Sequence, residues 1–318
     1  MTPLHSIDAP RAADCIESAV DSIDNPRDHL KPHVDDSSVR CSPLSSRSYS
    51  PSEILQYYVT TSSVNKTDTI EKFQAEVLRA ITHNTPGDHL FTHVPPCWGL
   101  KCFKELDEFY NCRKTWNSVD LTLRIKTMPA QVHDSHHGWI GISMQRWAVT
   151  PNLWTEAEGL LCVAQVGTTI EYTSGPLVGS KKEPDLLFAV NRQKYPTFAI
   201  EAGWSESAPR LIHDKDLLFN GAQGDTQVVI TIKWRKNINY QVSGSLKVWR
   251  WGQASPLEMT IFPRPVNGSL EEIHLSRSEV LGQSIQPGRN ASDILPLRLD
   301  HLRHIAADKL AVMGLTHT

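Results

Sequence analysis

Residues 184–205 read PDLLFAVNRQKYPTFAIEAGWS, and this stretch decides the predicted fold. It contains two short apolar runs, DLLFAV and TFAIEAG, each of the length of a β-strand, with polar and turn-forming residues between them. Both runs are apolar at nearly every position, which is typical of strands that are covered on both faces of a sheet. The stretch therefore predicts two central strands of an α/β protein.

Each of the two runs carries one carboxylate. Asp185 begins the first run, and Glu201 lies near the end of the second. Because residues two apart share one face of a strand, Glu201 is expected on the same face as Ala199 and Gly203. A carboxylate on an apolar strand is unfavourable unless another group pairs with it. Two interpretations are open: the acids meet and share a proton or a cation, or both are solvated strand ends that never meet.

The alternation of helix and strand continues on both sides of this stretch. Apolar spacing and chain breakers predict an α/β core over residues 150–265, in the order helix, three strands, helix, two strands. The expected elements are a helix over 150–166, strands at 168–172, 184–190 and 197–203, a helix over 209–220, and strands at 227–234 and 241–251.

The flanking regions are predicted to differ from this core. Residues 66–149 are expected to form an N-terminal α+β extension, and residues 266–318 a C-terminal appendage with a strand and a helix. Residues 1–65 are rich in Ser, Asp and Pro without an apolar period, so we expect a disordered tail. The expected flanking elements are helices at 68–81, 104–116 and 299–313, and strands at 121–126, 140–144 and 271–275.

Composition excludes several classes of protein. The chain has 318 residues, of which 40% are apolar and 21% charged, as in ordinary globular proteins. No run approaches the roughly 20 apolar residues of a membrane helix, so no membrane partner is expected. The N-terminus has no basic start followed by an apolar stretch, so we expect no secretory signal. The six cysteines are then expected to be reduced, in an intracellular protein of the cytoplasm or nucleus.

The charges are unevenly distributed. The chain has 32 basic and 35 acidic residues, a net charge of -3. Residues 1–65 hold 5 basic and 9 acidic residues, so the remaining 27 basic and 26 acidic residues give a net charge of +1. Because the predicted folded part is nearly neutral, nucleic acid is a candidate partner only through a local basic patch.

The helix predicted over residues 209–220 carries a lysine within its apolar stripe. Lys215 lies four residues after Leu211 and four before Phe219, so it is expected to point inward or to extend along the stripe. A buried lysine needs a carboxylate partner, and the nearest candidates in the sequence are Glu201 and Asp185. Lys215 is therefore either a functional cation or a structural counter-ion of Glu201.

This ordered set of elements resembles the PD-(D/E)XK nuclease superfamily, which has the restriction-endonuclease-like fold. The matching segments are KKEPDLLF, YPTFAIEAGWSES, LIHDKDLLF and TQVVITIKW. They are especially similar to a largely uncharacterised branch of the superfamily, in which the catalytic strand ends in Glu-x-Gly-x-Ser. The resemblance covers roughly residues 150–265.

The resemblance implies metal-dependent hydrolysis of phosphodiester bonds by a nuclease. Asp185 matches the aspartate of the Pro-Asp pair, and Glu201 matches the second acid. In active members these acids bind one or two Mg²⁺ ions, which hold the scissile phosphate and generate the attacking hydroxide. Glu156 or Glu158 matches the acidic residue that is often found on the first helix, and helical geometry does not choose between them. The implied cofactor is Mg²⁺ or Mn²⁺.

The sequence departs from the superfamily pattern at one position. The lysine that usually follows the second acid by two residues is here Gly203. Lys215 could supply that charge from the next helix, which makes Lys215, Glu201 and Asp185 the expected catalytic set. The alternative is a catalytically degenerate member that acts as a binding or scaffold protein, or as an accessory protein in a metabolic pathway. Whether the chain is an enzyme is therefore an open question at the level of sequence.

Two clusters of metal-ligand residue types lie in the N-terminal half of the chain. The first consists of His93, Cys97, Cys102 and Cys112. Its spacing fits a zinc knuckle poorly, because it contains only one Cys-x₄-Cys pair, so we expect buried structural thiols rather than zinc ligands. The second cluster consists of His133, His136 and His137. It is expected to be a solvated loop between two strands.

The predicted hairpin at residues 227–251 mixes basic residues with tryptophans. The residues concerned are Lys233, Trp234, Arg235, Lys236, Lys247, Trp249, Arg250 and Trp251. Basic residues beside aromatic ones suit phosphate contact combined with base stacking. The favoured interpretation is nevertheless an edge hairpin protected by charge, whose tryptophans cover the core.

Overall fold

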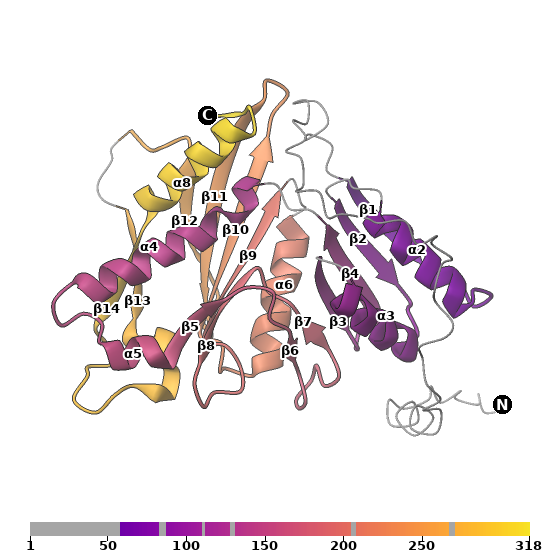
Figure 1. The fold of residues 1–318 in the computed structure, drawn as a ribbon, viewed down its shortest axis with the longest axis horizontal. Helices are drawn as coiled ribbons and strands as arrows, with labels where there is room; N and C mark the ends of the chain where they lie inside the picture. Colours follow the sequence, from indigo (N-terminus) through magenta and orange to yellow (C-terminus); the bar gives the residue numbers. More distant parts are fainter. Residues whose placement is uncertain (1–57, 83–86, 110–111, 128–130, 205–207, 267–270) are drawn as a thin grey trace, which may run out of the picture. The chain divides into compact units, whose positions relative to one another are not determined.

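The protein has a mixed α/β fold with several sheets (Figure 1). The computed structural model describes residues 58–318, with gaps at 83–86, 110–111, 128–130, 205–207 and 267–270. All of the described residues belong to one compact unit. The predicted tail lies mostly outside the described residues, but residues 58–63 form a strand, so the predicted boundary at residue 65 is wrong.

The first sheet has six strands in the order β1-β2-β4-β3-β7-β6. These are β1 (Tyr58–Ser63), β2 (Gly87–Thr92), β3 (Arg113–Asn117), β4 (Thr122–Thr127), β6 (Ile170–Glu171) and β7 (Lys181–Lys182). Strand β1 runs parallel to β2, and the other pairs are antiparallel. The strand predicted at 168–172 therefore exists as β6, but it belongs to this sheet and not to the sheet of the predicted core.

Two helices pack against the first sheet, α2 (Ile70–Thr82) and α3 (Pro96–Phe109). Phe73 and Val77 of α2 lie in one buried cluster with Trp116 and Leu123 of the strands. The helix predicted at 68–81 and the strand at 121–126 are confirmed. The helix predicted at 104–116 is partly wrong, since α3 begins at residue 96 and Trp116 lies in β3.

The second sheet has seven strands, and the decisive stretch of sequence lies at its centre. The path is β12-β11-β10-β9-β8-β5, with β15 paired to β11. The strands are β5 (Cys162–Gln165), β8 (Leu186–Val190), β9 (Phe198–Trp204), β10 (Val228–Lys236), β11 (Gln241–Arg250), β12 (Leu257–Phe262) and β15 (Thr316–His317). Strands β9 and β10 are parallel, and β8 is antiparallel to β9. The strands predicted at 184–190, 197–203, 227–234 and 241–251 are confirmed.

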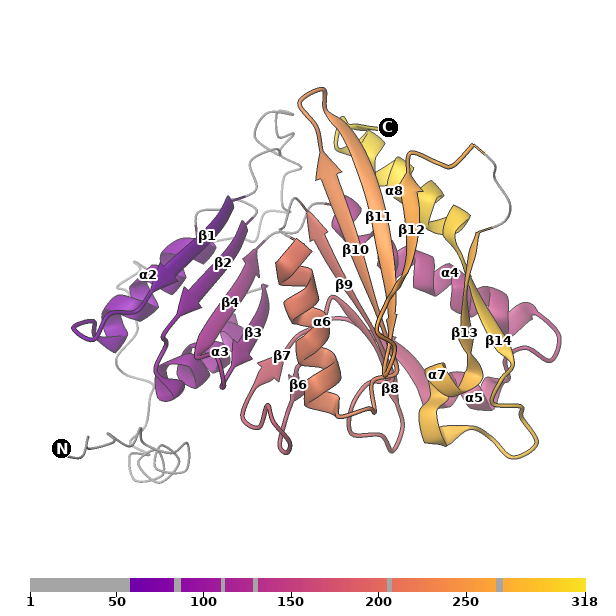
Figure 2. The ribbon, with the colours of Figure 1, turned by 180° about the vertical axis from the view of Figure 1, so that it is seen from behind.

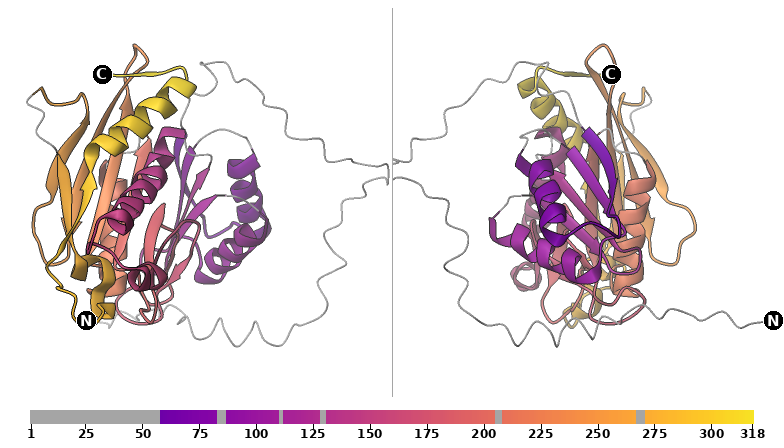
Figure 3. Two further views of the ribbon diagram at one scale, coloured as in Figure 1. Left: turned by 60° about the vertical axis from the view of Figure 1, so that its left-hand side comes forward. Right: turned by 90° about the vertical axis from the view of Figure 1, so that its right-hand side faces the viewer.

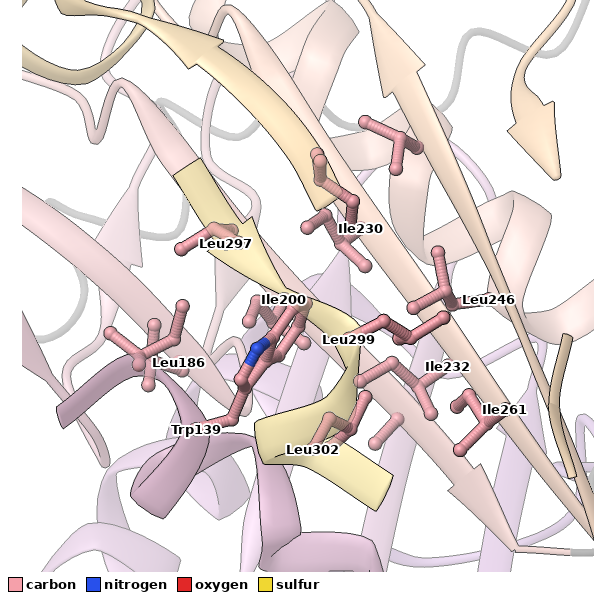
Figure 4. Packing of buried hydrophobic residues seen from close by; sticks show 14 of the residues in the cluster. Trp139, Leu186, Ile200, Ile230, Ile232, Leu246, Ile261, Leu297, Leu299 and Leu302 are labelled. Carbon is pink, nitrogen blue, oxygen red and sulfur yellow. The ribbon is translucent and has the colours of Figure 1, made fainter. Parts of the chain in front are cut away.

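Helices cover both faces of this sheet. Helix α6 (Ala208–Ala222) packs on β9 and β10, and Figure 2 shows it in front of the sheet, with β11 and β12 uncovered beside it. On the opposite face, α4 (Ser135–Val149) and α8 (Leu299–Val312) lie against each other (Figure 3). In the core shown in Figure 4, Trp139 of α4 and Leu302 of α8 pack with Ile200 of β9.

The remaining elements complete the side of the sheet that carries α4 and α8. Strands β13 (Glu272–Ser276) and β14 (Ile294–Arg298) form a hairpin-like pair, and the short helices are η2 (Gln131–Asp134), α5 (Glu156–Leu161), α7 (Arg277–Leu281) and η3 (Gly282–Ser284). The strand predicted at 271–275 and the helix at 299–313 are confirmed. Within the described ranges, no helix has both the length and the apolar character needed to cross a bilayer.

The strand predicted at 140–144 is wrong, because this segment lies inside α4. The alternating Ile-Gly-Ile-Ser-Met pattern suggested a strand, but Trp139, Ser143 and Trp147 are buried at intervals of four residues. This spacing is that of one helical face, and it extends over a longer segment than the alternation does. Helix α4 packs with α8 in the same core as β9, so the predicted boundaries at 149 and 265 do not separate independent cores.

The helix predicted from residue 150 is much shorter than expected. Helix α5 (Glu156–Leu161) spans only six residues, and the side chain of its N-cap residue Thr155 forms a capping box with Glu158. Residues 162–165 continue as β5, paired with β8. Leu160, an apolar residue of the predicted helix, is 70% exposed. The apolar residues that suggested one long helix belong to a loop, a short helix and a strand.

Two glycines provide a test of how closely the second core is packed. A Cβ atom on Gly244 would lie 2.4 Å from the ring of the buried Trp234, whereas a Cβ atom on Gly141 in α4 would meet nothing within 4 Å. We expect Gly244→Ala to destabilise the protein by about 1–3 kcal/mol. Gly141→Ala should stabilise it by up to about 1 kcal/mol. Chemical denaturation of both variants measures this, and equal effects would contradict the packing described.

Candidate functional site

Asp185 and Glu201 meet at the junction of β8 and β9. The two strands pair antiparallel with Leu186 opposite Ile200, which places the two acids next to this pair. The backbone N–H of Ala202 donates a hydrogen bond of 2.8 Å to Asp185 Oδ2. Both carboxylates are buried. Of the two interpretations that the sequence left open, the geometry matches the one in which the acids come together.

Two lysines from the first sheet contact these acids. Lys182 of β7 places its Nζ 2.8 Å from Glu201 Oε1. Lys126 of β4 places its Nζ 3.4 Å from Glu201 Oε2 and 3.7 Å from Asp185 Oδ2. Both lysines are buried. Each acid is therefore neutralised by an ammonium group of the same chain.

A third carboxylate, Asp214 of α6, binds the same lysines from the other side. Its Oδ1 lies 2.8 Å from Lys182 Nζ, and its Oδ2 lies 3.7 Å from Lys126 Nζ. Asp214 also accepts a hydrogen bond of 2.5 Å from Arg124 of β4. Both lysines thus lie between Asp214 on the helix and Glu201 on the strand.

Arg124 extends the ion pairs to Asp88 of β2. The Nε and Nη2 atoms of Arg124 donate to the two oxygens of Asp88 at 2.8 and 2.6 Å. Arg210, at the start of α6, adds a contact of 2.8 Å to Asp88. We call the whole set the charge cluster. Its members are Asp88, Arg124, Lys126, His133, Lys182, Asp185, Glu201, Arg210 and Asp214.

His133 of η2 closes the cluster beside Asp185. Its Nε2–H donates to the carbonyl oxygen of Ala202 at 2.9 Å and lies 3.5 Å from Asp185 Oδ2. Its other ring nitrogen, Nδ1, lies 3.0 Å from Asp134 Oδ1. Both ring nitrogens then act as donors, as in an imidazolium. Burial lowers the pKa of His133, but Asp185 and Asp134 outweigh this effect and raise it to about 10.

The histidine cluster is therefore not the solvated loop that was predicted. His133 and His136 are buried, and the segment is the helical start of α4 rather than a turn between strands. His137 donates through Nε2 to the backbone carbonyl oxygen of Asp185 at 3.1 Å. Burial lowers the pKa of His136 to about 3, so this ring is neutral.

The carboxylates of the cluster have opposite pKa shifts. For Asp185, burial raises the pKa, but the charges of Lys126 and His133 outweigh burial and lower it well below its usual range. For Glu201, burial raises the pKa to about 7, with Asp214 and Asp185 adding to the increase and the lysines opposing it. The cluster is thus the kind of environment in which one acid stays ionised while its neighbour titrates near neutrality.

One oxygen of each predicted acid lacks a hydrogen bond. Asp185 Oδ1 and Glu201 Oε1 are buried and accept none from the residues that the structure describes. Glu201 Oε1 is nevertheless 2.8 Å from Lys182 Nζ, so its charge is compensated by an ion pair without good hydrogen-bond geometry. Asp185 Oδ1 has Arg113 Nε as its ion-pair neighbour, at 4.0 Å.

Lys215, the predicted catalytic lysine, does not contact Asp185 or Glu201. It pairs with the adjacent Asp216 and lies over the ring of Trp249, with its Nζ 4.8 Å from the ring centroid. The buried face of α6 instead contains Leu211, Asp214 and Leu218. The predicted apolar stripe placed Lys215 at the centre of the buried face of α6, but that position belongs to the preceding residue, Asp214. One residue corresponds to a rotation of about 100° around the helix axis. Asp214 therefore points toward the acids, and Lys215 lies at the side of the helix.

The two glutamates predicted on the first helix also lie away from the acids. Glu156 is exposed at the start of α5. Glu158 is buried, completes the capping box of Thr155, and pairs with Arg277 and Arg289. Burial raises the pKa of Glu158. The hydrogen bond from the Thr155 backbone N–H and the charge of Arg277 outweigh burial, so the pKa of Glu158 is lowered overall. Glu158 therefore anchors α5 to the C-terminal part of the chain and is not a member of the charge cluster.

The proposed zinc ligands do not assemble either. Cys102 and Cys112 are buried in the core of the first sheet, and Cys97 is exposed. Burial raises the pKa of the Cys102 thiol to about 12 and that of Cys112 to about 11, so both are protonated thiols. Cys102 and Cys112 agree with the expectation of buried structural thiols, whereas Cys97 does not, because it is exposed.

A divalent cation fits the charge cluster poorly. Hard cations bind carboxylate and carbonyl oxygens, and here Asp185 Oδ2, Glu201 Oε2 and the carbonyl oxygen of Ala202 already face the Lys126 ammonium or the His133 ring. Across the described ranges, no set of three or more His, Cys, Asp or Glu side chains is arranged to hold a metal ion. A metal would have to displace cations that the chain itself supplies.

Comparisons with known proteins leave the chain without an identified family. No family model, no curated protein and no solved structure matches it.

Sequence reasoning missed six residues of the cluster: Asp88, Arg124, Lys126, Lys182, Arg210 and Asp214. Signals for three of them were present. Arg124 and Lys126 alternate on the polar face of a strand that was correctly predicted, and Asp214 is one turn after Leu211. Lys182 had no such signal, because β7 is only two residues long.

Lys182 and Lys215 form a matched pair for testing these assignments. Lys182→Met would leave Glu201 and Asp214 with one ammonium fewer in a buried site, and we expect a loss of about 3–5 kcal/mol in stability. Lys215→Met should cost only about 1 kcal/mol, because it removes the pair with the half-exposed Asp216 and two ring contacts, to Phe219 and Trp249. Denaturant titration of both variants decides this. Greater damage from the Lys215 substitution would contradict the cluster as described.

Glu201 gives the cluster a signature in the pH dependence of stability. Its pKa rises from 4.5 to about 7 on folding. The folded state thus binds this proton more tightly than the unfolded state, and stability should fall as pH rises from about 4.5 to about 7. Glu201→Gln removes this contribution. We expect the melting temperature of the wild type, relative to that of the variant, to decline across this window. Parallel curves would mean that the pKa of Glu201 is not raised.

Proposed function

We propose that the protein is a non-cleaving binding protein built on a nuclease-like α/β core. The observation that carries this proposal is the position of Lys126, whose ammonium lies between Asp185, Glu201 and Asp214. Lys126 and His133 engage the oxygens that a catalytic Mg²⁺ or Mn²⁺ would need. The predicted restriction-endonuclease-like arrangement of acids would then be retained as a structural ion-pair network.

Burial of the acids supports the same proposal. Asp185 and Glu201 are at most 1% exposed, and Lys182 is 1% exposed. A phosphodiester has to reach catalytic groups directly before hydrolysis can occur. In the described conformation these groups contact only each other and their protein neighbours.

We further propose that the partner is a nucleic acid that binds beside α6, on the face of β10 and β11 that this helix covers only in part. Residues alternate along these strands, and Figure 2 shows no helix in front of β11 on this face. We call the basic and aromatic members of this face, together with Lys215 of α6, the basic face. They are Lys215, Lys233, Arg235, Lys247 and Trp249. An intracellular location, in the cytoplasm or nucleus, belongs to this proposal.

Charge complementarity supports this partner. The basic face has four cationic side chains, of which Lys215 pairs with Asp216 and Lys247 pairs with Glu258. Trp249 lies among them, with the Nζ atoms of Lys215 and Lys247 within 6 Å of its ring. Cationic groups around an aromatic ring suit a polyanion that also presents flat bases. Trp234, by contrast, is fully buried, as the favoured interpretation of the hairpin expected. That interpretation is wrong on two other points, because β10 and β11 lie inside the sheet between β9 and β12, and Trp251 is 43% exposed.

A second candidate function is metal-dependent phosphodiester hydrolysis. It is favoured by the free Oδ1 of Asp185 and by the contact between Lys182 and Glu201. Two acids and a lysine then have the composition that the sequence resemblance implies, with Lys182 in place of Lys215. This function requires that the site opens and that Lys126 leaves the acids.

Manganese binding separates the two candidates. A ligand that binds only the folded state at a hundredfold excess over its dissociation constant stabilises the protein by about 2.7 kcal/mol. We expect millimolar Mn²⁺ to leave the melting temperature of the wild type unchanged. Lys126→Met removes the competing ammonium but keeps most of the side-chain stem, so Mn²⁺ should raise the melting temperature of this variant. Asp185→Asn in the same background is the control and should abolish the shift.

Cleavage assays complete the comparison. Wild type with Mg²⁺ or Mn²⁺ should not cleave single-stranded DNA, duplex DNA or RNA. Metal-dependent cleavage that is lost in both Glu201→Gln and Asp185→Asn would overturn the proposal and establish the second candidate. Binding of labelled nucleic acid without cleavage, weakened by Arg235→Ala and Lys247→Ala and by added salt, is the result expected for a binding protein.

A further inference from the structure

An aromatic and polar hollow lies at one end of the basic face. It has a volume of about 480 Å³ and is lined by Val119, Pro176, Leu177, Asn220, Gln223 and Trp251. Trp251 follows Trp249 by two residues, on the same side of the chain. Asn220 follows Lys215 along α6 and Gln223 comes directly after the helix, so the hollow continues the row that the basic face begins.

The chemistry of the lining is specific. None of the lining residues is charged. The indole of Trp251 is 43% exposed and is supported from inside by Phe219, whose ring centroid lies 5.7 Å away in an edge-on arrangement. The carboxamides of Asn220 and Gln223 supply both hydrogen-bond donors and acceptors. The hollow therefore combines a flat aromatic surface with groups that can read a polar edge.

We propose that this hollow takes one unpaired base of a single-stranded nucleic acid whose phosphates lie along the basic face. The inference rests on the nucleic-acid partner proposed above. It specifies in addition that this partner is single-stranded and that one of its bases enters the hollow. An unpaired base stacks on an exposed aromatic side chain, and its hydrogen-bonding edge is available to carboxamides. A base inside a duplex is stacked on both faces, and its Watson–Crick edge is already paired.

Charge and size select this occupant. A volume of about 480 Å³ lies in the range of sites that hold small molecules. The uncharged lining gives no partner for a phosphate inside the hollow, whereas Lys215, Lys247 and Arg235 lie on the face leading to it. A ligand that is anionic along its backbone and uncharged at its rings matches both surfaces at once.

The test measures binding of short labelled oligonucleotides to the full-length protein by fluorescence anisotropy. Trp251→Leu should weaken binding of a single strand about 10-fold or more, since the stacking contribution of one base is of that order. Asn220→Ala combined with Gln223→Ala should weaken it in the same direction. Tyr240→Leu is the matched control, because Tyr240 is a similarly exposed aromatic residue at the tip of the hairpin, and it should bind as the wild type does.

Three further measurements make the outcomes distinct. An abasic strand of the same length should bind the wild type as weakly as the normal strand binds Trp251→Leu, and a duplex should bind more weakly than the single strand. If Arg235→Ala and Lys247→Ala weaken binding while Trp251→Leu and the carboxamide variant do not, the hollow is not a base site, although the proposed partner stands. If the wild type binds no nucleic acid at low salt, both proposals fail. The carboxamide variant keeps the test valid should Trp251→Leu not fold.

Discussion

The position of the first sheet against the rest of the protein depends on the ion pairs of Asp214. This residue belongs to α6, a helix whose apolar face packs on the second sheet. Its carboxylate contacts Arg124, Lys126 and Lys182, all of which come from the first sheet. Asp214 thus connects cations of the first sheet to helix α6, which packs on the second sheet. Glu201 of β9, in the second sheet itself, binds two of the same cations, Lys126 and Lys182.

Charge balance explains how such a network can exist in a buried site. Within the charge cluster, the carboxylates of Asp88, Asp185, Glu201 and Asp214 face five cationic side chains, those of Arg124, Lys126, His133, Lys182 and Arg210. Removing one member of a buried pair exposes its partner to the full desolvation cost, whereas the intact set is compensated. A cluster whose own cations already match its carboxylates has little electrostatic reason to recruit a divalent cation, and this is the physical basis for proposing a protein that binds without cleaving.

The sequence predicted the elements correctly where apolar residues formed a continuous run or a regular helical stripe. It was misleading where only a few apolar residues alternated with polar ones. The strands around Asp185 and Glu201 and helices α2, α6 and α8 followed from runs or stripes that the structure retains. Helix α4 was missed because a few alternating residues outweighed the wider four-residue spacing of Trp139 and Trp147. The acids could be predicted from the strands that carry them. Lys126 could not, because it lies 75 residues before Glu201 and reaches it only through the pairing of the first sheet.

The order of strands in the first sheet has a consequence for how the chain folds. Strands β6 and β7, which complete that sheet beside β3, come from residues 170–182, after α4 and β5 of the other core. Because β3 pairs with β7, its edge stays open during synthesis until Lys181–Lys182 has been made, about 64 residues after the end of β3. An unpaired strand edge is a site for association with other chains. We therefore expect the nascent protein to be most prone to aggregate before strands β6 and β7 have paired with β3. The same segment contains Lys182, so the residue that neutralises Glu201 and the strand that covers the edge of β3 are added together.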